Sequence, residues 1–498
     1  MNLFRTKSVE QSIAETDEPE HRLKKTLGAL DLVVFGVGVI IGAGIFVLTG
    51  TVAASNSGPA IAISFAIAGL ACGLAALCYA EFASTVPVAG SAYTFSYATF
   101  GELIAWIIGW DLVLEFTIGS AALSTSFSSY LQELLDGTPF EIPASLSSAE
   151  DGLFNLPAVL VALAVMTVLI VGIKFSSRLN QVVVAIKLAV VLLVIVAGIG
   201  YIDRDNYSPF VPPSEAAPEG AGGFMDVTLL SSIFGLEPSV YGIAGVVAGA
   251  AIVFFAFIGF DIVATTAEET HNPQRDVPRG ILGSLAIVTV LYMAVSLVIT
   301  GMQDFRDIDP DDAAPLSTAF TVNGLDWMGD VIAVGACIGL IVVAMILMLG
   351  QTRVGFAMAR DGLLPLPLAK VHPRFGTPYI FTIITGVAVA AIAGFVPLST
   401  LAELVNIGTL FAFVLVSAGV VVLRRTRADL PRGFRVPAAP LVAGVAVLMC
   451  LYLMLNLSGG TWVRFLVWMG IGLIVYFAYG MRNSRLGRRE STVEETAR

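Results

Sequence analysis

One lysine, Lys187, lies inside a long apolar run of the sequence, VVVAIKLAVVLLVIVAG. A charged side chain at the centre of a membrane costs about 2.5 kcal/mol or more, so an ionisable residue in such a run is a candidate for function. A lysine amine can bind and release a proton, which would suit proton-coupled chemistry. The alternative interpretation is that Lys187 lies near a helix end and extends its amine to the membrane surface.

Carboxyl groups also lie within or beside apolar runs. Asp111 and Glu115 are four residues apart and therefore share one face of a helix. Glu115 could receive a proton or pair with a cationic ligand, and the alternative is a buried carboxyl that stays neutral or hydrogen-bonded. Asp261 lies two residues after Gly259 and could accept hydrogen bonds from backbone amides that a helix break there would free, as structural support. Glu102 precedes an apolar run, where the alternative is an acid stabilised by the helix dipole.

Glycine interrupts two of the apolar runs near their middles. The run at 33–50 contains Gly42 and Gly44, and the run at 253–269 contains Gly259. Because glycine weakens a helix, we predict helix breaks at these three positions. Taken singly, such glycines more often reflect close helix packing. Matching breaks in two halves of a membrane protein instead indicate the binding site of a transporter, because unpaired backbone groups are tolerated only where they line a cavity.

A broken helix offers two kinds of backbone group at one place. The N-terminus of the second half-helix points N–H groups at an anion, and the C-terminus of the first half-helix offers carbonyl groups to a cation. A ligand with a carboxylate and an ammonium on one carbon suits this arrangement. No charged side chain lies within 33–50, and none is needed to bind the backbone part of an amino acid.

The composition indicates the elements that must position these groups. Of the 498 residues, 56% are hydrophobic and 13% charged, whereas a soluble domain carries about 25% charged residues. This composition argues for an all-α polytopic membrane protein and against a soluble enzyme or a nucleic-acid binder. Twelve segments are long and apolar enough to cross a bilayer, namely 30–54, 60–83, 103–130, 156–173, 180–201, 243–267, 280–301, 328–356, 378–396, 399–423, 437–457 and 461–480.

The placement of charge predicts the orientation in the membrane. With twelve spans both termini share one side, and all but four of the 27 basic residues fall on that side. We therefore expect a multi-pass protein of the plasma membrane with both termini in the cytoplasm. Nearly half of the 38 acidic residues fall on the opposite side. Either a high-salt exterior or attraction of cationic substrates would account for this acidic outer surface.

Other chemistry is disfavoured by what the sequence lacks. The four cysteines lie in apolar runs and the three histidines in polar segments, so we predict no disulfide framework and no metal site in the membrane. No phosphate-binding loop motif is present, which argues against a nucleotide. No catalytic constellation is recognisable, so we expect neither an enzyme nor a cofactor.

Five blocks of sequence in order resemble the amino acid–polyamine–organocation superfamily of transporters. They are IIGAGIF (40–46), PVAGSAY (87–93), GELIAWIIGWDLVLEF (101–116), EETHNPQRDVPRGI (268–281) and GQTRVGFAMARDGLLP (350–365). The last three resemble the cationic amino acid transporter branch and its prokaryotic relatives. The resemblance covers about 22–480 and implies the leucine-transporter fold, a 5+5 inverted repeat of ten helices followed by two further helices.

This fold implies a division of the chain. The expected parts are a cytoplasmic N-terminal segment 1–29, a transport core 30–424 with repeats at about 30–201 and 243–424, helices 11 and 12 within 425–480, and a cytoplasmic tail 481–498.

The resemblance also implies roles for particular residues. Contacts from the first break to the carboxylate and amine of the substrate would come from the backbone at Ile40, Ala43 and Gly44. The second break would supply carbonyl groups for the amine and walls for the substrate side chain, at Phe255, Ala256 and Ile258. Phe255 stands where some relatives carry tryptophan. The residue of span 8 that determines specificity is not identifiable from the sequence.

The function that the resemblance implies is secondary active transport of α-amino acids by alternating access. Lys187 is similar in place to the sodium site of sodium-coupled relatives, so its protonated amine would bridge spans 1 and 8 and couple transport to protons. Glu115 and Glu102 resemble acids of the cationic transporters. The expected partners are an amino acid, a proton and the lipid bilayer, and the protein would be a monomer or a small oligomer.

Exchange is the alternative to symport. A membrane sensor is disfavoured by the short tails, and whether the substrate is cationic or small and neutral stays open.

Overall fold

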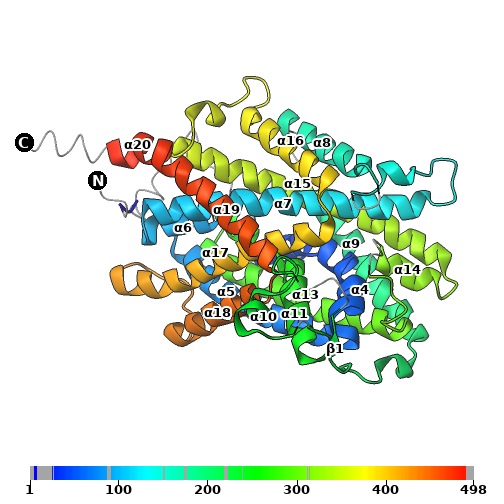
Figure 1. Cartoon of the computed structure of the whole chain (residues 1–498). Coiled ribbons are helices and arrows are strands. Elements are labelled where there is room, and N and C mark those ends of the chain that lie inside the picture. Colours follow the sequence, from blue (N-terminus) through cyan, green and yellow to red (C-terminus); the bar gives the residue numbers. More distant parts are fainter. Residues whose placement is uncertain are drawn as a thin grey trace, which may run out of the picture.

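The computed structural model describes residues 5–7, 25, 27–86, 91–149, 152–172, 177–217, 223–237, 239–310, 312 and 314–488. Much of the predicted terminal segments 1–29 and 481–498, and part of the PVAGSAY block, lie outside these residues. The described chain is mainly helical, and a long helix, α7 (Glu102–Leu135), runs through its middle (Figure 1).

The helices of the first half follow the apolar segments of the sequence. They are α2 (Ala29–Ile40), α3 (Ala43–Phe46), α4 (Leu48–Val52), α5 (Ile61–Thr85), α6 (Ser91–Thr99), α7, α8 (Leu156–Val171) and α9 (Ser177–Gly198). The short helix α6 was not predicted from the sequence, because its nine residues are too few and too polar to cross a membrane.

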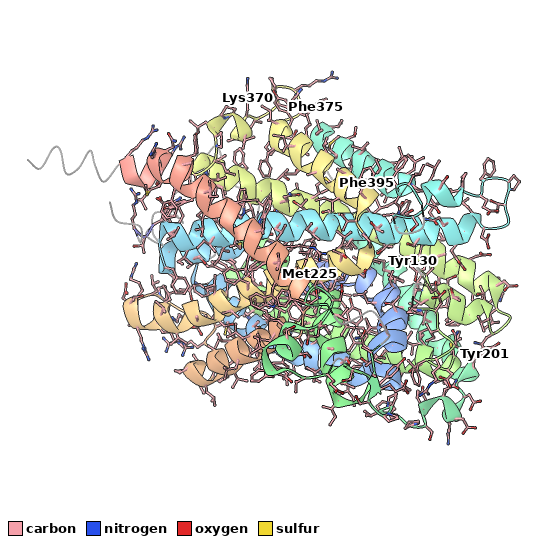
Figure 2. All side chains as sticks on the ribbon, viewed as in Figure 1. Tyr130, Tyr201, Met225, Lys370, Phe375 and Phe395 are labelled. Atoms are coloured by element: carbon pink, nitrogen blue, oxygen red, sulfur yellow. The ribbon has the colours of Figure 1, made fainter. Side chains whose placement is uncertain are left out.

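The second half also contains long helices and one interrupted helix. Its helices are α10 (Leu229–Phe234), α11 (Gly242–Val253), α12 (Phe260–Thr265), α13 (Pro273–Met302), α14 (Pro315–Thr321), α15 (Asp326–Arg360), α16 (Tyr379–Phe395), α17 (Leu398–Thr426), α18 (Ala439–Leu455), α19 (Gly459–Val475) and α20 (Met481–Asn483). Two short antiparallel strands, β1 (Glu215–Ala216) and β2 (Ser239–Val240), pair in the loop before α11. Figure 2 shows Lys370 and Phe375 in the loop that precedes α16 and Phe395 at the opposite end of that helix.

Within the described residues, eight helical segments are long and apolar enough to cross a membrane. Four shorter apolar helices accompany them: α2, α8, α16 and α18. Each of the twelve predicted segments contains helix. The count of twelve crossings and the 5+5 repeat stay predictions.

Local sequence signals set several helix ends. The side chain of Asn155 accepts a hydrogen bond from the amide of Ala158 at 3.1 Å and caps α8, with proline in the first turn. The helix ends at Val171, and the following residue, Gly172, has a φ of +69°, a left-handed conformation that glycine adopts without steric cost. These signals explain why α8 is a short, sharply bounded helix.

Two groups of helices are packed within themselves. In the first group, which we call the scaffold, α7 packs on α15 and α16, and α8 packs on α16 and α15. In the second, which we call the bundle and which comprises α2 to α5 and α11 to α13, α13 packs on α2 and α5, and α11 packs on α5. The helices α9 and α17 each contact both groups. Figure 1 shows α8 and α16 on one side of α7 and α5, α11 and α13 on the other.

Candidate functional site

The first interrupted helix breaks between α2 and α3. Helix α2 ends at Ile40, Ile41 is extended with φ −68° and ψ 101°, and Gly42 has φ −149° and ψ −149° before α3 begins at Ala43. The break therefore lies at Ile41 and Gly42. Gly44, predicted as a break residue, lies instead inside the first turn of α3. Its small size allows a packing contact that is described below.

The second interrupted helix breaks between α11 and α12. The chain tightens into a 3₁₀ turn at Phe254–Phe257, Ile258 is extended, and Gly259 has φ +111° before α12 begins. Such a φ is rarely adopted by residues with a side chain. The conformation of Gly259 is therefore what lets the chain restart as a helix in a new direction.

The two breaks adjoin each other. A Cβ atom at Gly44 would overlap the backbone and Cβ of Ala256, so the first turn of α3 touches the 3₁₀ turn directly. The hydroxyl of Tyr292, on α13, lies 2.8 Å from the carbonyl oxygen of Ile40 and 3.0 Å from that of Ala256. The single hydroxyl proton serves one of these acceptors at a time, so Tyr292 can tie either break to α13.

The first turn of α3 leaves backbone donors open. The first N–H groups of a helix have no intrahelical acceptor. Among the described residues, the amides of Gly42, Ala43 and Gly44 form no hydrogen bond, whereas the next amide, of Ile45, donates to the carbonyl of Gly42 at 3.3 Å. Buried amides without acceptors are rare in folded proteins, so this turn is suited to bind an anion such as a carboxylate.

Lys187 donates hydrogen bonds to backbone carbonyls on the other side of the first break. Its side chain is 1% exposed, and its amine donates to the carbonyl of Ile41 at 2.9 Å and to that of Gly38. The last carbonyls of a helix lack intrahelical donors and carry partial negative charge. The methylene stem of Lys187 crosses α15 at Gly339, where a Cβ atom would overlap it. No carboxylate of the described chain lies within ion-pair distance of the amine.

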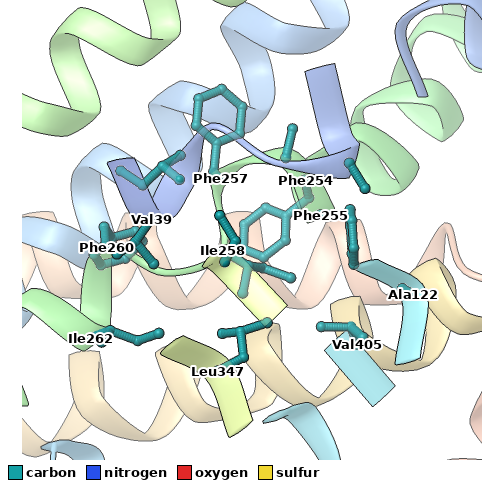
Figure 3. Packing of buried hydrophobic residues seen from close by; sticks show 14 of the residues in the cluster. Val39, Ala122, Phe254, Phe255, Phe257, Ile258, Phe260, Ile262, Leu347 and Val405 are labelled. Atoms are coloured by element: carbon teal, nitrogen blue, oxygen red, sulfur yellow. The ribbon is translucent and has the colours of Figure 1, made fainter. Parts of the chain in front are cut away.

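Buried apolar side chains pack beside the second break. Figure 3 shows Phe255 and Ile258 between the broken first helix and the side chains of Leu347 and Val405, while Phe257 points to the opposite side. Phe255 is 7% exposed and Ile258 is 9% exposed, and the other three are less exposed still. The predicted wall residues Phe255 and Ile258 therefore lie among buried apolar side chains, of which Phe257, Leu347 and Val405 were not predicted.

Three further carboxyl groups are buried in α7 and α12. Asp111 and Glu115 on α7 and Asp261 at the start of α12 are each at most 1% exposed. Glu115 lies within electrostatic range of the other two, and the hydroxyl of Thr409, on α17, is beside it. Both oxygens of Asp111 and one oxygen each of Glu115 and Asp261 lack a hydrogen-bond partner. Because these oxygens lack a partner, the group is suited to bind a proton or a cation.

Glu102 does not belong to this group. It begins α7, thirteen residues before Glu115, which corresponds to about 20 Å along the helix. Its carboxylate is 0% exposed and accepts hydrogen bonds from the hydroxyls of Tyr97 and Tyr476, both at 3.0 Å. The structure thus places Glu102 at one end of the scaffold and away from the breaks.

Sequence reasoning missed several residues that shape the site. Tyr292 and Thr409 are polar groups in apolar spans, and such groups usually have a buried partner, which is the signal that could have identified them. Gly339 could not be distinguished in the sequence from the other glycines of α15. Which glycine must stay small depends on the side chain that crosses it, and this cannot be read from one helix alone.

Comparison with known proteins gives the family. A profile described as amino acid permease matches residues 27–478. The chain is 46% identical to the branched-chain amino acid permease BcaP of Bacillus subtilis over 98% of this chain and 99% of that protein. It is 45% identical to the methylthioribose transporter of the same organism over 98% of this chain and 100% of the relative.

A plant relative shows the same similarity at lower identity. The chain is 39% identical to the vacuolar cationic amino acid transporter 4 of Arabidopsis thaliana, over 86% of this chain and 68% of that protein. The resemblance seen in the sequence blocks is thus confirmed, and the apolar helices fit a multi-pass membrane protein. The chain belongs to the amino acid permease family.

Proposed function

We propose that the protein is a secondary active transporter that carries α-amino acids across the plasma membrane by alternating access. In this proposal both termini are cytoplasmic and a proton moves with the substrate. The family of the chain supports amino acid transport. Because one relative is named as a methylthioribose transporter, membership of the family does not by itself identify the substrate.

One observation carries the proposal, namely that two broken helices adjoin with open amides on α3. The carboxylate of an amino acid would bind the amides of Gly42, Ala43 and Gly44, which have no acceptor in the described chain. Its ammonium would bind carbonyl groups of the 3₁₀ turn at Phe254–Phe257, next to Ala256. This arrangement recognises the part that all α-amino acids share and needs no charged side chain.

Proton coupling in this proposal depends on Lys187. When protonated, its amine holds the end of α2 through the carbonyls of Gly38 and Ile41. A neutral amine has fewer donors and no charge, so its hold on these carbonyls weakens. Loss of the proton would then free α2, in the bundle, from α9. Exchange of one amino acid for another is the alternative mode, and it would not need this step.

The packing of the helices supports a rocking motion. The pairs α2–α13 and α11–α5 correspond under the predicted repeat, as do α9–α15 and α17–α7. The bundle and the scaffold therefore form two internally packed bodies, with α9 and α17 between them. Rocking of one body against the other would expose the site to each side in turn.

For the substrate side chain we propose a branched aliphatic group. The lining by Phe255, Ile258, Leu347 and Val405 is apolar, and a relative with 46% identity is named as a branched-chain amino acid permease. A cationic side chain is the second candidate. Glu115 favours it, since this buried carboxyl has an oxygen without a partner and plant relatives are named cationic amino acid transporters.

The experiment that tests the function uses purified protein in liposomes. A thermal-shift screen against the twenty amino acids and methylthioribose identifies the ligand, and uptake of the labelled ligand is then measured with and without an inward proton gradient. We expect stabilisation by leucine, isoleucine and valine, and uptake that the gradient increases. Stabilisation by methylthioribose and by no amino acid would contradict the proposal.

Replacing Leu347 by alanine is expected to weaken leucine binding roughly tenfold, because a lost apolar contact in a pocket is worth about 1–3 kcal/mol. Alanine binding should change much less, since its methyl group is too short to reach this wall. Isothermal titration calorimetry measures both affinities. Leu349→Ala is the matched control on the same helix, where the side chain is 38% exposed. Equal losses for both ligands would place Leu347 outside the side-chain pocket.

Replacing Tyr292 by phenylalanine is expected to raise the Kd of the amino acid about three- to tenfold. The change removes the only hydroxyl that, among the described residues, joins the carbonyls of Ile40 and Ala256, and one net hydrogen bond is worth about 1 kcal/mol. Tyr452→Phe, at a half-exposed site on α18, is the control. An unchanged Kd for Tyr292→Phe would mean that the breaks hold their positions without this residue.

A further inference from the structure

Residues 5–7 lie along one end of the scaffold, beside α6 and α7. The carbonyl of Arg5 accepts the amide of Glu102 at 3.0 Å, and the amide of Lys7 donates to the carbonyl of Tyr97 at 3.3 Å. These backbone bonds align the segment with the end of α6 and the start of α7. Arg5 is only 7% exposed, so this part of the N-terminal region is built into the protein.

The side chains of this segment form two similar clusters. Glu102 lies 3.6 Å from the guanidinium of Arg5 and accepts the hydroxyl of Tyr97 at 3.0 Å. Asp361, at the end of α15, lies 3.3 Å from the amine of Lys7 and accepts the hydroxyl of Tyr93 at 2.7 Å. Each carboxylate thus receives one base from residues 5–7 and one tyrosine from α6.

The two tyrosines are four residues apart and share one face of α6. Burial raises the pKa of Tyr93 and of Tyr97 above the ordinary value, and the neighbouring carboxylates add to this. Both hydroxyls therefore keep their protons and act as donors. The result is that α6 is held to the scaffold through carboxylates that residues 5–7 also bind.

The C-terminal segment joins the same clusters. The hydroxyls of Tyr476 and Ser484 donate to Glu102, and the amide of Arg485 donates to the carbonyl of Asp361 at 3.0 Å. Described residues near both ends of the chain therefore meet at one end of the molecule. This is the end that the charge pattern predicts to be cytoplasmic.

The helix α6 also contacts the bundle. The ring of Phe95 stacks on Phe82 of α5 at 5.2 Å between centroids, and it lies 6.5 Å from the ring of Tyr79. Tyr79 in turn packs edge-on against Phe260, the first residue of α12, at 5.7 Å. An aromatic chain thus connects α6 to the helix that restarts after the second break.

We propose that residues 5–7 are a latch that holds α6 on the scaffold and thereby keeps this end of the transport pathway closed. With the latch bound, the bundle, which includes α12, can move away from α6 only by breaking the contacts of Phe95 with Phe82 and Tyr79. Without the latch, α6 can move together with α12, and this end opens more often. The inference rests on the proposed alternating-access cycle.

The latch is tested by the accessibility of α12. Thr265 lies one turn beyond Asp261 and is half-buried, so Thr265→Cys reports opening at this end of α12. All four native cysteines are buried, and the protein without the reporter gives their background. In lipid nanodiscs, the double variant Arg5→Ala with Lys7→Ala should react with a hydrophilic maleimide roughly tenfold faster than the parent, as a shift of the opening equilibrium requires.

Two comparisons decide the outcome. Lys25→Ala removes a positive charge from an exposed site of the same region and should leave the labelling rate unchanged. Lys7→Glu should raise the labelling rate, and adding Asp361→Lys to it should return the rate to that of the parent. This charge exchange tests the latch even if the variant with both Arg5→Ala and Lys7→Ala does not fold. Equal rates in the latch variants and the parent would overturn the latch. The readout uses no substrate, so a wrong transport assignment would show separately as absent uptake.

Discussion

Replacement of Lys187 by alanine is expected to abolish amino acid accumulation driven by a proton gradient. The amine of Lys187 holds the end of α2 through two backbone carbonyls, and alanine can neither bind these carbonyls nor exchange a proton. Substrate binding should persist, weakened by roughly tenfold or less, because the amides of α3 are unchanged. Gradient-driven uptake and binding, measured on the same preparation, separate the two effects.

The control for this prediction is Lys187→Gln. The glutamine amide can still donate to a carbonyl, but it cannot titrate, so it separates hydrogen bonding from proton exchange. We expect Lys187→Gln to be more stable to heat than Lys187→Ala and equally unable to accumulate substrate. Accumulation by either variant at the parental level would remove Lys187 from the coupling mechanism.

Replacement of Gly44 by valine is expected to eliminate measurable binding of the amino acid. A Cβ atom at this position would overlap the backbone of Ala256, so α3 and the 3₁₀ turn must separate. Overpacking of this kind costs about 1–3 kcal/mol, which corresponds to roughly a 5- to 150-fold loss of affinity even before the carboxylate site is distorted. Titration calorimetry with the identified ligand measures the loss.

Gly73→Val is the matched control for this change. Gly73 lies in α5, where an added Cβ would meet no atom within 4 Å. This variant should bind the ligand as the parent does. If Gly44→Val also retained the parental affinity while folded, the carboxylate site would have to lie elsewhere.

The positions of the breaks were largely predictable, because the cause is local. Gly42 and Gly259 stand in otherwise apolar helices, and a glycine with φ of +111° is a property of its own chain segment. The sequence therefore identified the two segments that meet. The prediction of a break at Gly44 was wrong, because Gly44 is helical. Its lack of a side chain lets α3 pack against Ala256, a residue more than two hundred positions away.

The remaining parts of the site depend on contacts between distant helices. The bond of Tyr292 to Ile40 joins residues 252 positions apart, and Lys187 reaches Ile41 across 146 positions. Periodicity and composition describe single helices and do not specify which faces meet. For the same reason the sequence did not predict that Tyr97 and Tyr476 bind Glu102, or that Thr409 lies beside Glu115.

Proton movement during substrate entry gives the most direct test of the transport mechanism. A pH-sensitive dye inside proteoliposomes reports the lumenal pH while leucine is added outside, with no gradient imposed. Symport through Lys187 predicts acidification that depends on leucine, requires the protein and is absent for Lys187→Ala. Entry of labelled leucine at the same rate without any change in lumenal pH would contradict proton-coupled transport.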